Sequence, residues 1–393
     1  MDNNHTKPAS LAILGTRGIP ARHGGFETFA EKLAIFLVGK GWEVDVYCQT
    51  DRQEEPYLWN GVRLVPMRAP GDGDSAFSTI VFDLLATLHS LKNDRLPLVL
   101  GYNTAWLSIF YRLTGRRSVM NMDGIEWRRD RWPRYVKPWF WLNERLGCYL
   151  SNHLIADHPE ILRHLATRVG TSKISLIPYG ADPVVDADPM LIKPLFPGEY
   201  ALVVGRIVPE NSILEIVRSW SRAGFSHRLV VVGTLDPTFN VYHRAVKEAA
   251  GKFVHFHGAV YDKAALAALR LYARFHVHGH RVGGTNPSLV EALAAGSPII
   301  AHDNPFNRWV AGAHSAYFGD ESELILACAE LGFAPPERLA TLSAASRARH
   351  KEAFGWDAIL ARYERALLQW VRPASAPTRQ IRRVEEGRIS GSS

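Results

Sequence analysis

Gly283-Gly-Thr-Asn-Pro-Ser-Leu-Val-Glu291-Ala-Leu-Ala-Ala-Gly296 reads as a glycine-rich turn, a short apolar helix and a glycine stop. A predicted strand at Pro298–Ala301 follows directly. Because turn, helix and strand alternate in this way around parallel sheets, the segment predicts a doubly wound α/β domain. The N–H groups of Thr285–Leu289 would then be exposed at the positive end of the helix dipole, where a diphosphate binds well.

Glu291 is the carboxylate of this segment. Its neighbours Val290, Ala292 and Leu293 are apolar, so the carboxylate needs a hydrogen-bonding partner. Two ribose hydroxyls would provide one. A position of Glu291 on a solvated helix face stays open as the alternative.

The alternation of strands and helices extends from this segment towards both termini. It runs from Leu11–Leu14 to Ile174–Ile177, and again from Tyr200–Val204 to Pro298–Ala301. The polar, proline-rich residues Ala181–Pro197 separate the two runs and read as a linker. We therefore expect two doubly wound, Rossmann-like domains with a deep cleft between them, and a ligand at the carboxyl ends of the strands.

The domain boundaries follow from this pattern. We expect residues 1–185 to form the first domain and residues 186–372 the second, whose final helix near Trp356–Trp370 crosses back onto the first. Residues 373–393, rich in Pro, Arg, Gly and Ser, read as a disordered tail.

Two further positions suit an anionic ligand. Gly24-Gly25 begins an amphipathic helix just after the first strand, near Arg17, so its N–H groups could hold a phosphate; a plain tight turn is the alternative. Arg206 ends the first strand of the second domain, and its guanidinium matches phosphate geometry. A surface ion pair of Arg206 with Glu210 or Glu215 is the alternative there.

Composition narrows the class of protein. The chain has 393 residues, 47% of them hydrophobic, and a net charge of +7, which fits a globular protein of two domains. Its apolar runs are shorter than the roughly 20 residues of a membrane span, and three scattered cysteines and no leader pattern predict a cytoplasmic protein. No nucleic-acid-binding module accompanies the positive charge, so we expect it to face phosphates or anionic lipid.

The opening Gly15-Thr-Arg-Gly-Ile-Pro-Ala-Arg-His-Gly-Gly-Phe-Glu-Thr-Phe-Ala-Glu31, with Arg206 and the segment at Gly283–Gly296, resembles family 4 glycosyltransferases of the GT-B fold. The resemblance covers about Leu11 to Trp370. The opening is similar to a bacterial subgroup that includes rhamnosyltransferases of surface-polysaccharide assembly.

This resemblance implies a retaining transfer without a metal or other cofactor. The donor would be a dTDP-, UDP- or GDP-linked hexose or deoxyhexose, with rhamnose favoured, held by the second domain. The acceptor would be a polyprenyl-diphosphate-linked sugar or a glycan, held by the first domain. The resemblance also allows a peripheral location at the inner face of the plasma membrane. Arg206 would bind the diphosphate, Glu291 the ribose, and Gly24-Gly25 the phosphate or sugar. The expected donor-binding set is Gly24, Gly25, Arg206, Asn211, Gly284, Thr285, Asn286, Ser288, Leu289 and Glu291.

The chain departs from the broad family at three positions. Asn211 stands where a lysine is usual, Gly283 where a sugar-facing glutamate is usual, and Asp123 where a histidine is common. Our hypothesis is that Arg17, His280 or Arg281 replaces the missing positive charge. Asp123, with Arg206, is the candidate catalytic residue, and would orient a donor hydroxyl or help to accept the acceptor's proton. A loop carboxylate paired with Arg128 or Arg129 is the alternative for Asp123.

Two patterns compete as metal sites. Asp72-Gly-Asp74 resembles a metal-binding pair of carboxylates, but capping of the following helix by Asp74 or Ser75 is the favoured interpretation. His276, His278 and His280 share one face of a strand, which suits zinc, but strand-end histidines beside an anionic ligand are favoured.

Trp127–Trp141 is rich in aromatic and basic residues, which suits a lipid interface, and a buried aromatic helix with a solvated basic face is equally compatible. Two other function classes also stay open. One is a catalytically weak glycan- or nucleotide-binding protein, which Asn211 and Gly283 motivate, and the other is a nucleotide-sugar epimerase.

Overall fold

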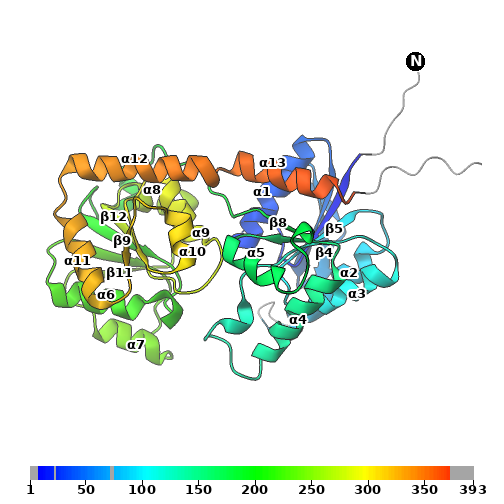
Figure 1. The fold of residues 1–393 in the computed structure, drawn as a ribbon, viewed down its shortest axis with the longest axis horizontal. Helices are drawn as coiled ribbons and strands as arrows, with labels where there is room; N and C mark the ends of the chain where they lie inside the picture. The colour runs from blue at the N-terminus through cyan, green and yellow to red at the C-terminus, as the bar shows by residue number, and fades with distance from the viewer. Residues whose placement is uncertain (1–7, 22–23, 71–74, 372–393) are drawn as a thin grey trace, which may run out of the picture.

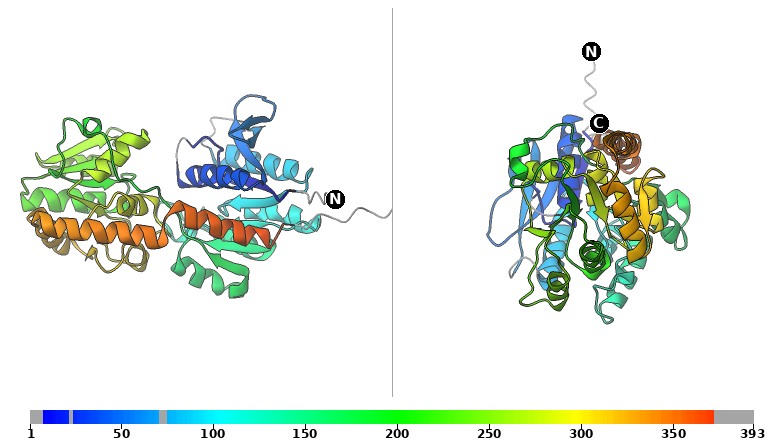
Figure 2. Two further views of the ribbon diagram at one scale, coloured as in Figure 1. Left: turned by 90° about the horizontal axis from the view of Figure 1, so that it is seen from above. Right: turned by 90° about the vertical axis from the view of Figure 1, so that its left-hand side faces the viewer.

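The computed structural model describes residues 8–21, 24–70 and 75–371 (Figure 1). These residues form two α/β domains that lie end to end, each built around one sheet (Figures 1 and 2). The predicted fold class, two doubly wound domains, is confirmed. The predicted boundary at residues 185 and 186 lies between the last strand of the first sheet and the first strand of the second, and the predicted tail at 373–393 lies outside the described residues.

The first sheet has eight strands in the order β3-β4-β2-β1-β5-β6-β7-β8. All its pairs are parallel except β3 with β4. The strands are β1 Ser10–Leu14, β2 Glu43–Thr50, β3 Tyr57–Trp59, β4 Val62–Arg68, β5 Leu96–Leu100, β6 Val119–Asn121, β7 His153–Ala156 and β8 Ile174–Leu176. The order reverses between β1 and β5, which is where ligands bind in open parallel sheets.

The second sheet has six parallel strands in the order β11-β10-β9-β12-β13-β14. The strands are β9 Tyr200–Val204, β10 Arg228–Val232, β11 Val254–Gly258, β12 Phe275–His278, β13 Ile299–His302 and β14 Ala316–Phe318. Here the order reverses between β9 and β12. Arg206 follows the first of these strands and His280 the second, so the sheet topology brings both to one edge.

Helices cover both faces of each sheet. The helices of the first domain are α1 Gly25–Gly39, α2 Ala76–Ser90, α3 Ile109–Leu113, α4 Lys137–Leu150 and α5 Pro159–Ala166, with 3-10 turns η1 Ala105–Ser108, η2 Glu126–Arg128 and η3 Thr171–Lys173. The second has α6 Ile213–Ala223, α7 Val241–Glu248, α8 Lys263–Leu271, α9 Pro287–Ala294, α10 Pro305–Ala311, α11 Glu321–Gly332, α12 Pro336–Ala353 and α13 Trp356–Leu368, with η4 Pro189–Ile192 and η5 Pro209–Asn211.

The burial of β1 shows why its sequence is continuously apolar. All five of its residues are buried. Leu11 and Ile13 pack in the cluster that includes α1, whereas Ala12 and Leu14 pack on the opposite face with α2. A strand covered on both faces has no solvent side, so it shows no alternation of polar residues.

Helix α2 begins with the cap that the sequence favours. The Ser75 hydroxyl accepts a hydrogen bond from the Ser78 N–H at 3.1 Å. The competing metal-binding pair, Asp72 and Asp74, lies outside the described residues.

Helix α13 follows the second domain in the chain and packs against the first. Figure 1 shows α12 along the carboxyl-terminal domain and α13 along the amino-terminal domain. Trp356 and Tyr363 of α13 are buried in the same cluster as Phe29 of α1, whose ring centroid lies 4.5 Å from that of Tyr363. Trp356 also makes an edge contact with Tyr179 at 5.0 Å. Helix α13 is therefore part of the amino-terminal core.

We expect Trp356→Ala to lower the free energy of unfolding by about 3–5 kcal/mol, because it empties a buried aromatic site between the domains. Phe239→Ala is the matched control, since Phe239 is 88% exposed on the carboxyl-terminal domain and its loss should change stability by less than about 0.5 kcal/mol. Urea unfolding followed by fluorescence measures both variants. Equal effects of the two substitutions would contradict the central role of α13.

Candidate functional site

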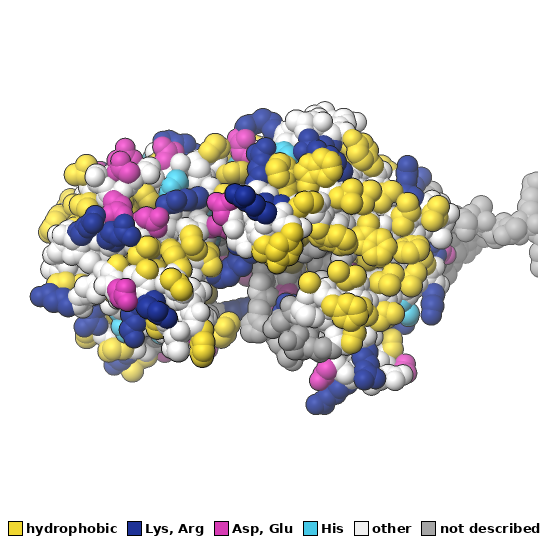
Figure 3. All heavy atoms as spheres, turned by 90° about the horizontal axis from the view of Figure 1, so that it is seen from below, with side chains coloured by type: hydrophobic (Ala, Val, Ile, Leu, Met, Phe, Trp, Pro, Cys, Tyr) yellow, Lys and Arg dark blue, Asp and Glu magenta, His cyan; other side chains and the backbone are white. Residues whose placement is uncertain are grey.

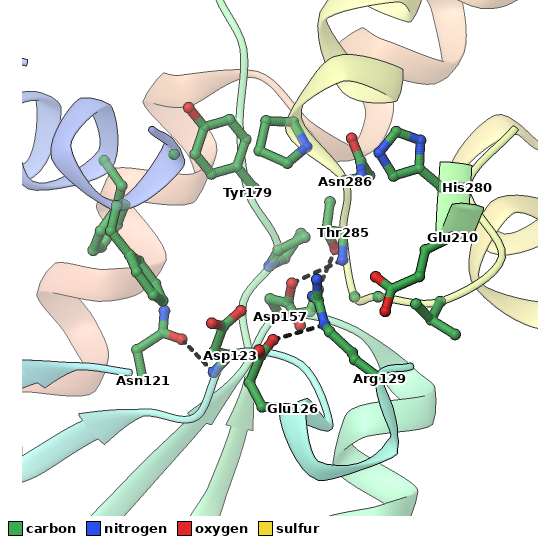
Figure 4. Close-up of a pocket in the computed structure, with 18 of the residues that line it drawn as sticks. Asn121, Asp123, Glu126, Arg129, Asp157, Tyr179, Glu210, His280, Thr285 and Asn286 are labelled. Atoms are coloured by element: carbon green, nitrogen blue, oxygen red, sulfur yellow. Dashed lines mark hydrogen bonds and ion pairs between the residues drawn. The ribbon is translucent and has the colours of Figure 1, made fainter. Parts of the chain in front are cut away.

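A cavity of about 310 Å³ lies between the two domains (Figure 4). It is lined from the first domain by residues after β6 and β7 and from the second by residues after β9 and β12. Of the expected site residues, it is lined by Gly25, Asp123, Arg206, Asn211, His280, Gly284, Thr285 and Asn286. Within the described part of the chain, Gly24, Ser288, Leu289, Glu291, Arg17 and Arg281 are not part of its lining.

Gly25 marks how closely the two domains approach. A Cβ atom built on Gly25 would lie 3.2 Å from Cγ of Pro287, at the start of α9, and 3.7 Å from the Tyr179 ring. Gly24, just before it, has φ of 95°, a conformation that favours glycine. The glycine pair therefore lets α1 of one domain begin directly opposite α9 of the other.

At the start of α9, the N–H groups of Thr285, Ser288 and Leu289 are hydrogen-bonded within the protein, whereas the sequence predicts that they are exposed. The Asp157 side chain, which follows β7, accepts a hydrogen bond from the Thr285 N–H at 2.7 Å (Figure 4). The Ser288 N–H donates to the Asn286 side chain at 3.0 Å, and the Leu289 N–H to the Asn286 carbonyl at 3.1 Å. Pro287 has no N–H. The Asp157 carboxylate of the first domain thus accepts the hydrogen bond of an N–H group that the sequence assigns to binding a diphosphate.

Asp157 itself was not among the expected residues. The Thr285 hydroxyl also donates to the Asp157 backbone carbonyl, so the pair is joined twice across the cleft. A Cβ atom on Gly284 would overlap the Asp157 carboxylate, so this approach requires glycine. Burial, and then the charge of Asp123, raise the pKa of Asp157 to about 7.

Asp123 lies in the cavity beside Asp157 (Figure 4). Its N–H donates to the Asn121 side chain at 3.1 Å, and Asn121 in turn donates to the Tyr363 hydroxyl of α13 at 2.7 Å. Its φ of 52° is unusual for a residue with a side chain, so the loop holds Asp123 in a strained conformation. Burial and the charge of Glu126 raise the pKa of Asp123 to about 6.

Glu126 organises the loop after Asp123. Its side chain pairs with Arg129 at 2.7 Å and with Arg131 at 2.6 Å, and accepts a hydrogen bond from the Trp132 indole at 2.9 Å. Arg129 therefore pairs with Glu126 and not with Asp123. The charge of Arg129 only partly offsets the rise in the pKa of Asp123. Nothing in the sequence marks Glu126 or Arg131 as a site residue, and the sequence points to Arg129 only as a possible partner of Asp123.

Arg206 lines the cavity opposite these residues. Burial lowers its pKa, and so do the charges of Arg131 and Arg129, which shows that three guanidinium groups gather here. Of the predicted alternative partners, Glu215 pairs with Arg281 at 2.8 Å. Glu210 lines the cavity with Arg206 and accepts a hydrogen bond from the Arg131 N–H at 2.9 Å.

The three expected compensating charges are not placed as predicted. Arg281 pairs with Glu215, and neither Arg281 nor Arg17 is among the lining residues of the described chain. His280 does line the cavity, but burial and the charge of Arg206 lower its pKa to about 3, so it is neutral at pH 7. Among the described residues, the cations that line the cavity beside Arg206 are Arg129 and Arg131.

Glu291 has a partner within the protein. Its carboxylate lies 2.5 Å from the guanidinium of Arg270, a buried residue of α8. Burial, and then the charge of Glu291, raise the pKa of Tyr179, which lines the cavity. Glu291 is thus paired and partly exposed, and its contact with a ribose stays a prediction.

The histidines form a stack rather than a metal site. The rings of His276 and His278 lie 6.1 Å apart and those of His278 and His280 4.3 Å apart, and burial lowers the pKa of all three. Among the residues that the structure describes, no group of three or more His, Cys, Asp or Glu is arranged to hold a metal ion.

Comparison with known proteins assigns the two domains separately. Residues 9–182 match a family model described as a domain of unknown function (DUF1972), and residues 196–323 match the model of glycosyl transferases group 1. No curated protein matches the chain.

Solved structures match almost the whole chain. Sucrose-phosphate synthase from Thermosynechococcus elongatus superposes with a TM-score of 0.77 at 20% identity, covering 92% of this chain and 98% of that one. HepE from Anabaena in complex with UDP gives 0.68 at 13% identity (92% and 100% covered). A UDP-forming trehalose-phosphate synthase from Burkholderia vietnamiensis gives 0.70 at 11% identity (92% and 100% covered). These matches show the GT-B fold.

The raised pKa of Asp157 makes a prediction about stability. The folded protein holds a proton on this carboxyl that the unfolded chain releases, so the contribution of Asp157 to stability falls as pH rises from about 4 to about 7. Between pH of about 5.5 and about 8, the wild type should lose stability relative to Asp157→Asn, by up to about 1.4 kcal/mol per pH unit. Titrations common to both proteins, such as that of His158, cancel in this difference. Thermal unfolding at both pH values measures it, and parallel pH profiles of the two proteins would contradict the assignment.

Proposed function

We propose that the protein, which is a glycosyltransferase of the GT-B fold, transfers a hexosyl or deoxyhexosyl group, rhamnosyl being favoured, from a nucleoside-diphosphate sugar to a glycan or polyprenyl-diphosphate-linked acceptor. The observation that supports this most is the convergence of Arg129, Arg131 and Arg206 with the start of α9 in one interdomain cavity. Guanidinium groups and a helix amino terminus are the groups that bind diphosphates.

The donor diphosphate would take the place of Asp157. In the structure, Asp157 engages the Thr285 N–H, and Arg129 lies close enough to lower the pKa of Asp157. A diphosphate offers more negative charge to the same N–H and guanidinium groups. When the diphosphate enters, its oxygens would replace the Asp157 carboxylate as the hydrogen-bond acceptor. Arg129 and Arg131 would supply the positive charge that the broad family usually has from a lysine at the position of Asn211.

The chemistry would follow from these charges. Negative charge grows on the leaving diphosphate as the bond to the sugar breaks, so Arg206 and Arg129 would bind the transition state more tightly than the ground state. Asp123, whose pKa is raised to about 6, would orient a hydroxyl or share the acceptor's proton. Retention at the anomeric carbon and independence of a metal rest on the resemblance to family 4 enzymes.

The acceptor side of the proposal concerns surface-polysaccharide synthesis at the inner face of the membrane. Among the described residues, no helix is both long and apolar enough to cross a bilayer.

A panel of UDP-, GDP- and dTDP-sugars, measured by thermal shift with and without EDTA, tests the proposed function. One nucleotide sugar should stabilise the protein by about 2.7 kcal/mol at 100 times its dissociation constant, and EDTA should not reduce that shift. If none of the donors shifts unfolding, the proposal is wrong. A changed sugar nucleotide released without any acceptor would favour the epimerase alternative instead.

We expect Arg206→Ala to reduce kcat/KM by about 10²–10³, as does the loss of one preorganised donor to a developing anion. Arg129→Gln should reduce kcat/KM by at least about tenfold for the same reason. Arg281→Gln is the matched control, because Arg281 pairs with Glu215 outside the cavity lining, and it should change kcat/KM by less than about twofold. Steady-state kinetics decide between them: a larger loss in Arg281→Gln than in Arg129→Gln would restore the sequence-based hypothesis.

A further inference from the structure

Helix α2 has an apolar outer face. Between Ala76 and Ser90 its charged side chain is Asp83, which is buried, with His89 half-buried near the end. Phe77 is 67% exposed, and Leu85 and Leu88 are also exposed. A surface helix normally turns polar residues to solvent, and a helix that is apolar all round is normally covered. The sequence of α2 therefore indicates a helix that is buried on all sides, yet apolar side chains on its outer face are exposed.

Helices α3 and α4 continue this surface. The turn η1 packs against α2, α3 and α4, so the three helices are neighbours. Leu113 of α3 is 77% exposed, and Trp139 and Leu142, three residues apart on α4, are also exposed. Figure 3 shows a broad hydrophobic area over the amino-terminal domain. We call Phe77, Leu85, Leu88, Leu113, Trp139 and Leu142 the apolar face.

The tryptophans of the segment Trp127–Trp141, which the sequence predicts for a lipid interface or a buried helix, do not all face the same way. Trp127 and Trp132 turn inwards, where their indole N–H groups donate to Glu144 at 2.7 Å and to Glu126 at 2.9 Å. Trp139 is exposed, with its N–H fixed on the Asn103 carbonyl at 2.9 Å. Trp127 and Trp132 thus fit the alternative of a buried aromatic segment. The exposed Trp139 remains compatible with a lipid interface.

The charge around the apolar face is positive. Residues 102–150 contain nine Arg or Lys and four Asp or Glu. Of the four acids, Glu126 and Glu144 are buried and Asp123 lines the cavity, whereas Arg112 and Arg117 beside Leu113 are exposed. Exposed leucine and tryptophan bordered by arginine is the composition that binds a bilayer with anionic headgroups.

We propose that the apolar face docks on a bilayer containing anionic lipid and so brings the interdomain cavity to acceptors anchored in that bilayer, an inference that rests on the proposed function. The loop between η2 and α4 joins the two places. Arg129 and Arg131 of this loop line the cavity, as does Glu126 of η2, and Trp139 of the apolar face follows within ten residues of Arg129. Docking would hold the cavity near the headgroups, where the phosphates of a lipid-linked sugar lie.

Vesicle flotation of the full chain tests this. The wild type should bind vesicles of phosphatidylcholine with phosphatidylglycerol at low salt, and bind pure phosphatidylcholine more weakly. Leu85→Ser/Leu88→Ser should reduce the affinity for the mixed vesicles by at least roughly tenfold, because two apolar side chains leave the contact. Phe239→Ser/Tyr261→Ser is the matched control, since these side chains are 88% and 70% exposed on the other domain, and it should bind as the wild type does.

Three results would overturn the docking surface. They are no flotation of the wild type with phosphatidylglycerol, equal flotation of the two double variants, or a wild-type dimer that Leu85→Ser/Leu88→Ser converts to a monomer without any vesicle binding. The last would make the apolar face a contact between copies of the chain. The thermal shift with nucleotide sugar, measured on the same variants, reports folding and donor binding separately, so failure of docking is distinguishable from failure of the proposed function.

Discussion

The cleft between the two domains is held by carboxylates that occupy positions suited to an anionic ligand. Asp157 of the first domain holds the Thr285 N–H of the second, and Glu210 of the second holds the Arg131 N–H of the first. Enclosed charges are stable only when they are paired and hydrogen-bonded. The same donors would serve a diphosphate, so the contact that joins the domains in this structure is also the contact that a donor can replace.

The sheet topology and helix α13 position the residues that make this contact. Carboxyl ends of strands from both sheets face the cleft: Asp123 and Asp157 follow β6 and β7 of the first sheet. Arg206 and His280 follow β9 and β12, between which the second sheet reverses its strand order. Helix α13 returns to the first domain, where Tyr363 binds Asn121 and Asn121 binds the Asp123 N–H. The carboxyl-terminal helix thus supports the loop that carries the candidate catalytic carboxylate.

The sequence predicted the fold and half of the site for a physical reason. Apolar strands and glycine-rich turns are local signals, so the two domains, Arg206 and the loop at Gly284–Asn286 were all identified. Partners that come from the other domain leave no such signal. Asp157 and Glu126 look like ordinary loop acids in sequence, and their roles appear only when Thr285 and Arg129 lie beside them. Arg281, which the sequence offers as a compensating charge, pairs with Glu215 outside the cavity lining, and adjacency in sequence does not reveal that pair.

The account's central claim is that a nucleoside diphosphate replaces the Asp157 carboxylate at Thr285. The direct measurement is the dissociation constant of UDP, GDP and dTDP for the wild type and for Asp157→Asn, by isothermal titration calorimetry at neutral pH. Removing the competing negative charge should make the preferred nucleotide bind more tightly to Asp157→Asn, because an amide repels phosphate less than a carboxylate does. Unchanged or weaker binding by Asp157→Asn would contradict the claim.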